Sequence, residues 1–191
     1  MTSSMTKDLT DKKKTFSAKD LSLTAMMSVL IAICSWISIP TTVPFTLQTF
    51  AVFCALGLLG GRRGFFSVLV YILLGAVGVP VFAEFTGGFG ILLRPTGGYI
   101  VGFLFMAGFY WLTDKLLGEN LIVKIMSMIG GLALLYVFGT AWFMFIYTQN
   151  TGTIDLVTAL KWCVIPFVVW DMIKLAFAVS ITEAVKRRVK I

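Results

Sequence analysis

Residues 162–181 read WCVIPFVVWDMIKLAFAVSI, an apolar run with two charged side chains, Asp171 and Lys174, inside it. A run of this length is sufficient for a helix to cross the hydrocarbon core of a bilayer. Asp171 lies near its centre and Lys174 follows three residues later, so both lie on one face of the helix. A charge at the bilayer centre costs roughly 2.5–3.5 kcal/mol on insertion scales. We therefore expect the pair to face a polar partner or cavity inside the protein, which is typical of a functional site.

The rest of the chain has the composition of a membrane protein. Of its 191 residues, 58% are hydrophobic and 13% are charged, and the mean hydropathy is +0.93. A soluble domain carries more charge than this. The net charge of +7 is concentrated at the expected membrane flanks and forms no separate basic stripe, so nucleic acid is not an expected partner.

Six membrane-spanning segments separated by turn signals predict an all-α integral membrane protein with six transmembrane helices. They are 21–39, 46–59, 64–79, 97–117, 121–147 and 158–185. The second and third are short for full crossings, so 46–79 could instead form one broken helical pair. This division gives a cytoplasmic N-terminal arm, 1–20, and a six-helix transmembrane substrate-binding domain, 21–191.

The basic residues predict the orientation of these segments. Of the 16 Lys and Arg, 13 lie within 7–19, 62–63, 115–124 and 186–190. Because cytoplasmic flanks are enriched in Lys and Arg, both termini are expected in the cytoplasm. The loops 40–45, 80–96 and 148–157 are then expected outside.

Common catalytic and metal-binding patterns are absent from the sequence. There is no GxxxxGK[ST] phosphate loop, no GxSxG elbow and no HExxH. Histidine is absent, and Cys34, Cys54 and Cys163 lie in apolar segments without CxxC spacing. We therefore expect neither an enzyme nor a metal or other cofactor.

The pair at 171 and 174 indicates what kind of ligand a pocket here would take. Asp171 accepts hydrogen bonds and Lys174 donates them, so a neutral head with an N–H donor beside a carbonyl would satisfy both. Gln48 and Tyr99 each begin a span at its outer end and could add polar contacts. The alternative is a structural ion pair that locks the last helix. Aromatic side chains could form the apolar walls: Trp142, Trp162, Phe167 and Trp170.

The outer segment 80–95, PVFAEFTGGFGILLRP, is too apolar for an ordinary solvated loop. Irregular backbone at membrane depth is tolerated where it is buried in protein or lines a cavity. We expect this segment to fold back over a pocket, with an ordinary packed connector as the alternative.

Small residues recur at four-residue steps in the first span, at Thr24, Ser28 and Ala32. Such a face lets helices approach closely in lipid. It is expected either to pack inside the chain or to meet another protein.

Several stretches in succession resemble the BioY family, the biotin-specific S components of energy-coupling factor (ECF) transporters. The similar stretches are Ile39–Pro40, Val43–Thr49 (VPFTLQT), Leu59–Gly64 (LGGRRG), Tyr71–Ala83 (YILLGAVGVPVFA), Gly87–Gly88, Pro95–Tyr99 (PTGGY), and Pro166 with Asp171 and Lys174.

The resemblance implies a multi-pass protein of the prokaryotic cell membrane that binds biotin near its outer face for ATP-driven uptake. It also implies two kinds of partner, a transmembrane coupling protein and two cytoplasmic ATPases. Asp171 and Lys174 would contact the ureido ring, with Gln48, Gly88, Tyr99 and Trp142 completing the site. The face at Thr24, Ser28 and Ala32 would meet the coupling protein.

Two positions depart from the family pattern, because glycine is common where this chain has Glu84 and Arg94. These charges could form a local clasp between the ends of the outer segment. Alternatively, Arg94 could hold the ligand carboxylate, since a guanidinium suits planar carboxylates. Two other functions stay open from the residues alone: a self-sufficient secondary transporter of a small vitamin, and a membrane assembly module without a substrate.

Overall fold

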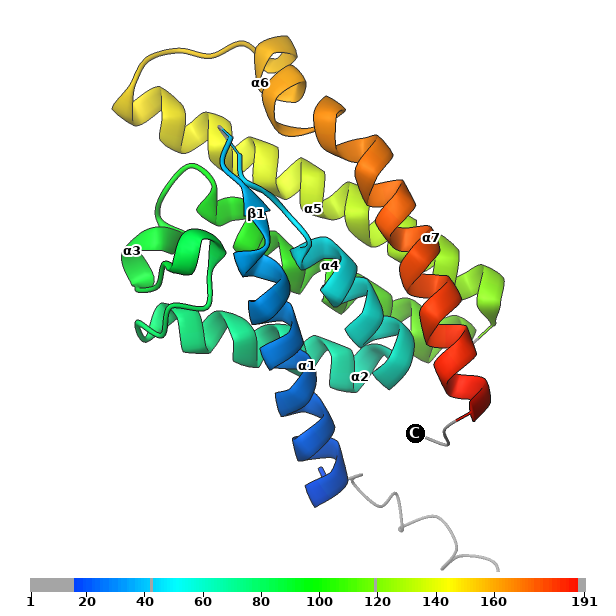
Figure 1. Ribbon diagram of the computed structural model, residues 1–191. Coiled ribbons are helices and arrows are strands. Elements are labelled where there is room, and N and C mark those ends of the chain that lie inside the picture. The colour runs from blue at the N-terminus through cyan, green and yellow to red at the C-terminus, as the bar shows by residue number, and fades with distance from the viewer. Residues whose placement is uncertain (1–15, 42, 119, 189–191) are drawn as a thin grey trace, which may run out of the picture.

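The computed structural model is a bundle of helices with one short hairpin (Figure 1). It describes residues 16–41, 43–118 and 120–188, so most of the predicted arm, residues 1–15, lies outside it. Within these described residues, five helical stretches are long and apolar enough to cross a membrane: α1, α2, α4, α5, and α6 with α7. The elements are α1 (Ala18–Trp36), β1 (Ser38–Ile39), β2 (Phe45–Thr46), α2 (Gln48–Ala76), η1 (Ala83–Phe85), α3 (Phe89–Leu92), α4 (Gly97–Leu117), α5 (Leu121–Asn150), α6 (Leu156–Cys163) and α7 (Ile165–Arg188).

Helix α1 begins and ends three residues earlier than the sequence predicted. Ser17 caps its start, because the Ser17 hydroxyl accepts from the Asp20 N–H at 3.1 Å and the Asp20 carboxylate accepts from the Ser17 N–H at 3.0 Å. At the other end, Ser38–Ile39 leave the helix and pair antiparallel with Phe45–Thr46. The segment before α2 is therefore a small hairpin.

Helix α2 is the broken helical pair that the sequence allowed. Gly60 has φ 77° and ψ 176°, a conformation open almost only to glycine, and it separates two helical halves. The second half starts at Gly61, whose N–H donates to the Asp114 carboxylate at 2.8 Å. A side chain at 61 would overlap the backbone of Trp111. The two halves meet at a sharp bend in Figure 1.

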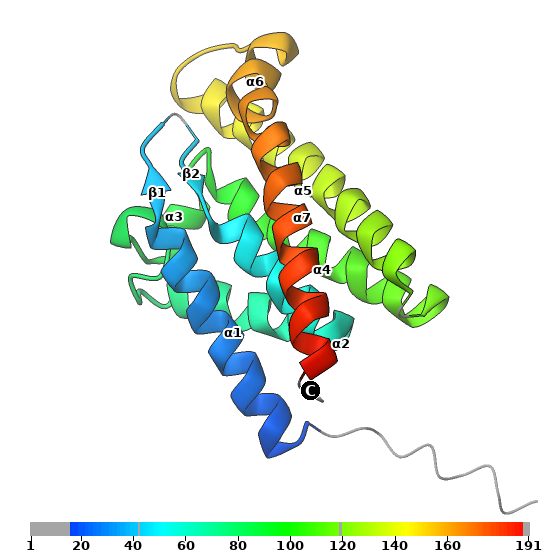
Figure 2. The same ribbon diagram turned by 45° about the vertical axis from the view of Figure 1, so that its right-hand side comes forward.

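The last predicted span is also interrupted, between α6 and α7 at Val164. Pro166, the second residue of α7, has no N–H to donate to the carbonyl four residues earlier, which breaks the helix. Helix α6 consequently lies over the end of α5, whereas α7 packs along α2 (Figure 2).

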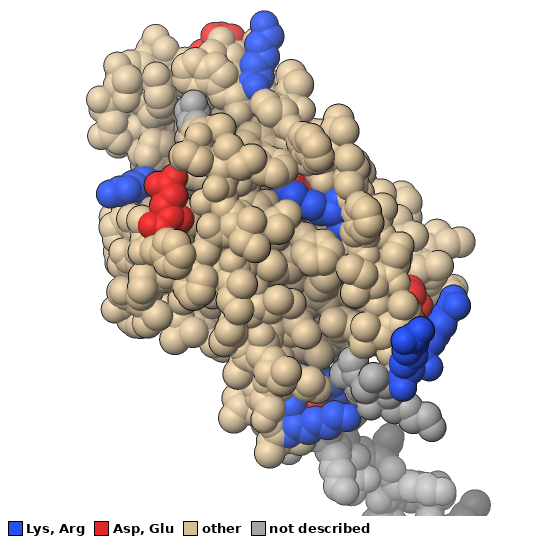
Figure 3. Space-filling view, in the orientation of Figure 1, with Lys and Arg blue, Asp and Glu red and all other residues tan. Residues whose placement is uncertain are grey.

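Helix α2 is the centre of the molecule, and α1, α4 and α7 pack around it. Residues 51–57 in its first half are all buried. The start of α1 and the end of α7 lie at the same end of the bundle (Figure 1). The face seen in Figure 3 is mostly uncharged, and several of its Lys and Arg lie near that end.

The small-residue face of α1 packs inside the chain. Thr24, Ser28 and Ala32 are 3%, 1% and 5% exposed. The Ser28 hydroxyl donates to the carbonyl of Ser67 on α2 at 2.8 Å. Of the two expectations for this face, the structure shows internal packing, and it leaves Met26, Val29 and Ile33 on the exposed side of α1.

Replacing Ser28 therefore tests the contact between α1 and α2. Ser28→Ala is expected to lower the free energy of unfolding by about 1 kcal/mol through the lost hydrogen bond. Ser28→Trp is expected to lower it much more, because the two backbones can no longer approach. The measurement is thermal unfolding in detergent, with Ala25→Trp on the exposed side as the control. Equal stability of the two Trp variants would contradict this packing.

Candidate functional site

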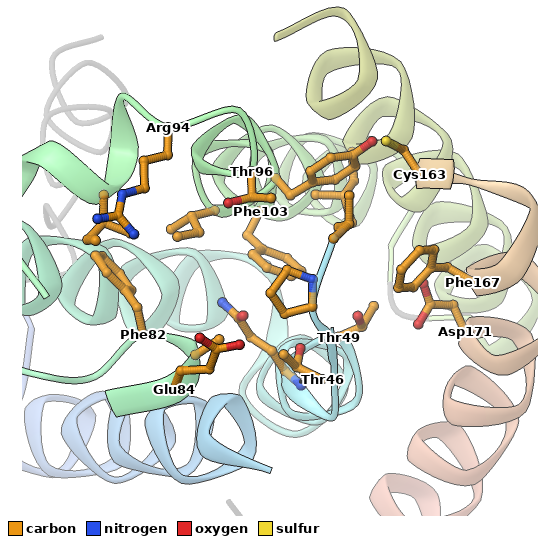
Figure 4. A pocket seen from close by; sticks show the side chains of 18 of the residues that line it. Thr46, Thr49, Phe82, Glu84, Arg94, Thr96, Phe103, Cys163, Phe167 and Asp171 are labelled. Carbon is orange, nitrogen blue, oxygen red and sulfur yellow. Dashed lines mark hydrogen bonds between the residues drawn. The ribbon is translucent and has the colours of Figure 1, made fainter. Parts of the chain in front are cut away.

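A cavity of about 160 Å³ lies among β2, the start of α2, the 82–96 segment, α4, α5 and α7. Charged side chains mark its two ends, with Asp171 at one and Glu84 and Arg94 at the other (Figure 4). Its apolar lining includes Val43, Pro44, Phe82, Ile91, Ile100, Phe103, Leu135 and Phe167. Its polar lining includes Thr46, Gln48, Thr49, Thr86, Thr96, Tyr99, Tyr136 and Lys174. Six of the eight predicted ligand-binding residues are thus brought to one cavity.

Asp171 and Lys174 form a buried ion pair at the inner end of this cavity. The Lys174 ammonium lies 2.9 Å from Oδ1 of Asp171, and the two residues are only 3% and 7% exposed. In such a low-dielectric environment, the attraction between the two charges offsets their desolvation only if their remaining donors and acceptors are also hydrogen-bonded.

Tyr136 on α5 satisfies the other oxygen of Asp171. Its hydroxyl donates to Oδ2 of Asp171 at 2.6 Å, a short bond of the charge-assisted kind. Each carboxylate oxygen has two acceptor directions, and one on each oxygen is already used. Asp171 therefore keeps capacity for a further donor from the cavity, in a fixed orientation.

The hairpin holds Lys174 from the opposite side. The carbonyl of Thr46 accepts from the Lys174 ammonium at 2.7 Å, and the ammonium also lies 4.2 Å from the centroid of the Phe45 ring. Both contacts stabilise a cation. A ligand acceptor that binds the Lys174 ammonium would either share it with the Thr46 carbonyl or displace that carbonyl.

Gln48 and Tyr99 line the cavity and are each fixed by one further hydrogen bond. The Gln48 amide donates to the Tyr71 hydroxyl at 3.1 Å. The Tyr99 hydroxyl lies 2.9 Å from the hydroxyl of Thr140. These bonds hold both side chains in place at the cavity wall.

Glu84 and Arg94 lie at the exposed end of the cavity and do not form the expected clasp. Within residues 16–41, 43–118 and 120–188 there is no ion pair between them. The clasp is therefore not formed in this structure, and Arg94 lines the cavity without a carboxylate partner among the described residues.

Gly88 and Trp142 do not line the cavity. Gly88, at φ 103°, starts α3 and donates its N–H to the Gly75 carbonyl at 2.7 Å. Trp142 donates its indole N–H to the Arg94 carbonyl at 3.1 Å and covers Gly98, where a Cβ would lie 2.3 Å away. Gly88 thus ties the outer segment to the end of α2, and Trp142 ties it to α5.

The expected aromatic walls are only partly right. Phe167 lines the cavity, whereas Trp162 and Trp170 line a separate groove beside Phe45 on the outer side of α7. Two further aromatic side chains, Phe82 and Phe103, line the cavity.

Sequence reasoning missed Tyr136, although it directly contacts Asp171. The available signal was a hydroxyl-bearing ring in the middle of an apolar span. The residues described contain no group of three or more His, Cys, Asp or Glu that could hold a metal ion.

Comparison with known proteins identifies the family. Residues 5–191 match the BioY family over nearly the whole chain. The chain belongs to the BioY family. The biotin transporter BioY of Thermotoga maritima is 39% identical over 166 residues, which cover 85% of this chain and 92% of that protein. BioY2 of Lactococcus lactis, also named a biotin transporter, is 38% identical over 81% of this chain and 82% of its own length.

A solved structure has the same fold as this BioY protein. It is the S-component for biotin from an ECF-type ABC transporter, with a TM-score of 0.77 and 29% identity over 88% of this chain and 91% of that chain. Together with five apolar helices long enough to cross a bilayer, the family membership makes this a multi-pass protein of the cell membrane.

The hydrogen bond from Tyr136 predicts a difference between two tyrosine variants. Tyr136→Phe leaves a buried carboxylate oxygen with one donor fewer, so it is expected to lower the free energy of unfolding by about 1.5–3 kcal/mol. Tyr99→Phe removes a bond between neutral groups and is expected to cost about 0.5–1.5 kcal/mol. Thermal unfolding in detergent compares the two. A smaller cost for Tyr136→Phe would show that Asp171 does not depend on this donor.

Proposed function

We propose that this BioY protein is the substrate-binding subunit that captures biotin at the outer face of the membrane for an ECF transporter. The observation that carries the proposal is the buried Asp171–Lys174 pair, which ends an otherwise mostly apolar cavity. The comparisons name relatives that are biotin transporters and a structural neighbour that is an S-component for biotin.

The ureido ring of biotin suits the inner end of the cavity. One edge of this ring presents an N–H beside a carbonyl oxygen, so the N–H can donate to Asp171 and the carbonyl can accept from Lys174. The ligand head and the pair are both neutral overall, so no net charge is buried. The apolar bicycle and chain of biotin would lie along Phe82, Phe103 and Phe167.

The carboxylate of biotin would then lie towards the exposed end, where Arg94 is. The guanidinium can hold it with two parallel hydrogen bonds. Gln48 and Tyr99 remain proposed as wall contacts, whereas Gly88 and Trp142 contribute by holding the segment that carries Arg94.

The proposed topology has six membrane-crossing segments, with both termini in the cytoplasm. This number counts the halves of α2 separately and α6 with α7 as one. Asp20 near the start of α1 pairs with Arg63 after the α2 break at 2.8 Å, so these two places lie at the same end of the bundle. The basic residues 186–188 end α7 there too, which favours that end as cytoplasmic.

The proposed partners are a transmembrane coupling protein and two cytoplasmic ATPases. The sequence has no phosphate loop of its own, so the protein is proposed to be no enzyme and to depend on another chain for ATP hydrolysis. Thr24, Ser28 and Ala32 could meet the coupling protein only by leaving α2, so α1 would contact it through its exposed side. No cofactor beyond the ligand biotin is expected.

Identification of the bound molecule tests the function itself. Biotin is expected to co-purify and to be released on denaturation, which mass spectrometry detects. Release of another small vitamin would favour a different substrate, and a ligand-free protein that does not bind added biotin would leave the assembly-module alternative. The relatives give no support to that alternative or to a self-sufficient secondary transporter.

The ion pair gives a sharper prediction. Asp171→Asn and Lys174→Met are each expected to weaken biotin binding by about 2–5 kcal/mol, since each variant leaves a buried charge unpaired and removes a ligand contact. Calorimetric titration in detergent measures the affinity. The matched control is Lys124→Met, which breaks another ion pair, Lys124–Glu183 at 2.8 Å, away from the cavity. Near-normal affinity in well-folded Asp171 and Lys174 variants would exclude the ligand role.

A ligand comparison tests the role of Arg94. Arg94→Ala is expected to weaken binding of biotin about two- to five-fold, the worth of an exposed ion pair. Biotin amide lacks the carboxylate charge, so its affinity is expected to change far less in the same variant. Equal losses for biotin and for its amide would mean that Arg94 acts on the segment and not on the carboxylate.

A further inference from the structure

The exposed end of the cavity carries one cation and one anion that do not neutralise each other. Glu84 and Arg94 both line the cavity, and both are exposed. In Figure 4 they lie on the same side of it and come from different parts of the outer segment. In the described part of the chain neither has an ion-pair partner. Two opposite charges are thus available to a ligand at the same opening.

The backbone at Glu84 shows that this position is unusual. Glu84 has φ 58° and ψ 30°, and Phe85 after it has φ 55°. A left-handed conformation is uncommon for residues other than glycine, asparagine and aspartate, and such residues cluster at ligand-binding sites. The local hydrogen bonds impose this conformation: the N–H of Phe82 donates to the Thr86 carbonyl at 2.9 Å, which closes a tight turn around Glu84.

A carboxylate at this place does not help to bind biotin itself. The free carboxylate of biotin is attracted by Arg94, but it is repelled by Glu84, and both effects act at the water-exposed end. A head group with a carboxylate and an ammonium would instead pair its carboxylate with Arg94 and its ammonium with Glu84. The pair therefore matches a zwitterionic amino-acid head better than a simple carboxylate.

We propose that the cavity also binds biotin whose carboxyl is amide-linked to an amine bearing an α-amino-acid head, such as biotin joined to the side-chain amine of lysine. The inference rests on the proposed binding of biotin, because the ureido ring would occupy the same inner end. The amide keeps the rings and the chain of biotin unchanged. Arg94 then binds the α-carboxylate, Glu84 binds the α-ammonium, and the longer head extends through the exposed end.

A ligand series that adds first the amide-linked chain and then the charged amino-acid head tests this assignment. Calorimetry in detergent compares biotin, biotin butylamide and ε-N-biotinyl-lysine on the wild-type protein. Biotinyl-lysine is expected to bind about 4- to 25-fold tighter than the neutral butylamide, because two exposed ion pairs each contribute about two- to five-fold. Since both pairs are exposed, raising the salt concentration is expected to reduce this ratio.

Variants of Glu84 separate its contribution from that of Arg94. Glu84→Gln is expected to weaken biotinyl-lysine about two- to five-fold, to leave the butylamide unchanged and to tighten biotin slightly, since a repulsive charge is removed. Arg94→Gln is expected to weaken both biotin and biotinyl-lysine. If Glu84→Gln does not fold, Glu84→Asn replaces it, because asparagine tolerates the left-handed conformation.

The outcomes distinguish this inference from the proposed function. Failure of the wild-type protein to bind biotin would overturn both. Normal biotin binding, with biotinyl-lysine no tighter than the butylamide, would overturn only the inference. The inference would also be overturned if Glu84→Gln changed the affinities for biotinyl-lysine and for the butylamide by the same factor.

Discussion

The buried ion pair between Asp171 and Lys174 is the constraint on which the rest of the site depends. Removing two charges from water costs several kcal/mol for each ion, and their attraction offsets this only with further hydrogen bonds. Those bonds come from Tyr136 on α5 and the Thr46 carbonyl on β2, with the Phe45 ring beside the ammonium. The need to satisfy one pair on α7 therefore fixes the positions of a second helix and of the hairpin.

Two breaks in the helices make room for this arrangement. Because Gly60 adopts a conformation available almost only to glycine, α2 can run through the centre of the bundle and then turn away beneath α4. The break before Pro166 redirects the chain between α6 and α7. It lets α6 lie over α5 and brings Cys163 to the cavity. A straight helix over 156–188 would carry α6 away from this wall.

The sequence predicted the membrane class, the charged pair and the break in α2, because each depends on local rules of length, charge and glycine geometry. It did not predict Tyr136 or the placing of Trp162 and Trp170. The span that holds Tyr136 is apolar on all sides, so no amphipathic pattern tells which of its faces points inward. The break at Val164 separates Trp162 from the helix that carries Asp171 and Lys174. The spacing of Thr24 and Ser28 predicted close packing, but spacing alone does not name the neighbour, which is α2.

The two ends of the cavity differ in how strongly their charges can discriminate between ligands. At the inner end water is excluded, so a ligand that fails to match Asp171 or Lys174 leaves a buried group unsatisfied, and the loss is large. At the exposed end water screens Glu84 and Arg94, so a mismatch there costs little. Strict selection of the head at one end thus coexists with tolerance of different tails at the other. This difference follows from burial alone, because the charged groups are of the same kinds at both ends.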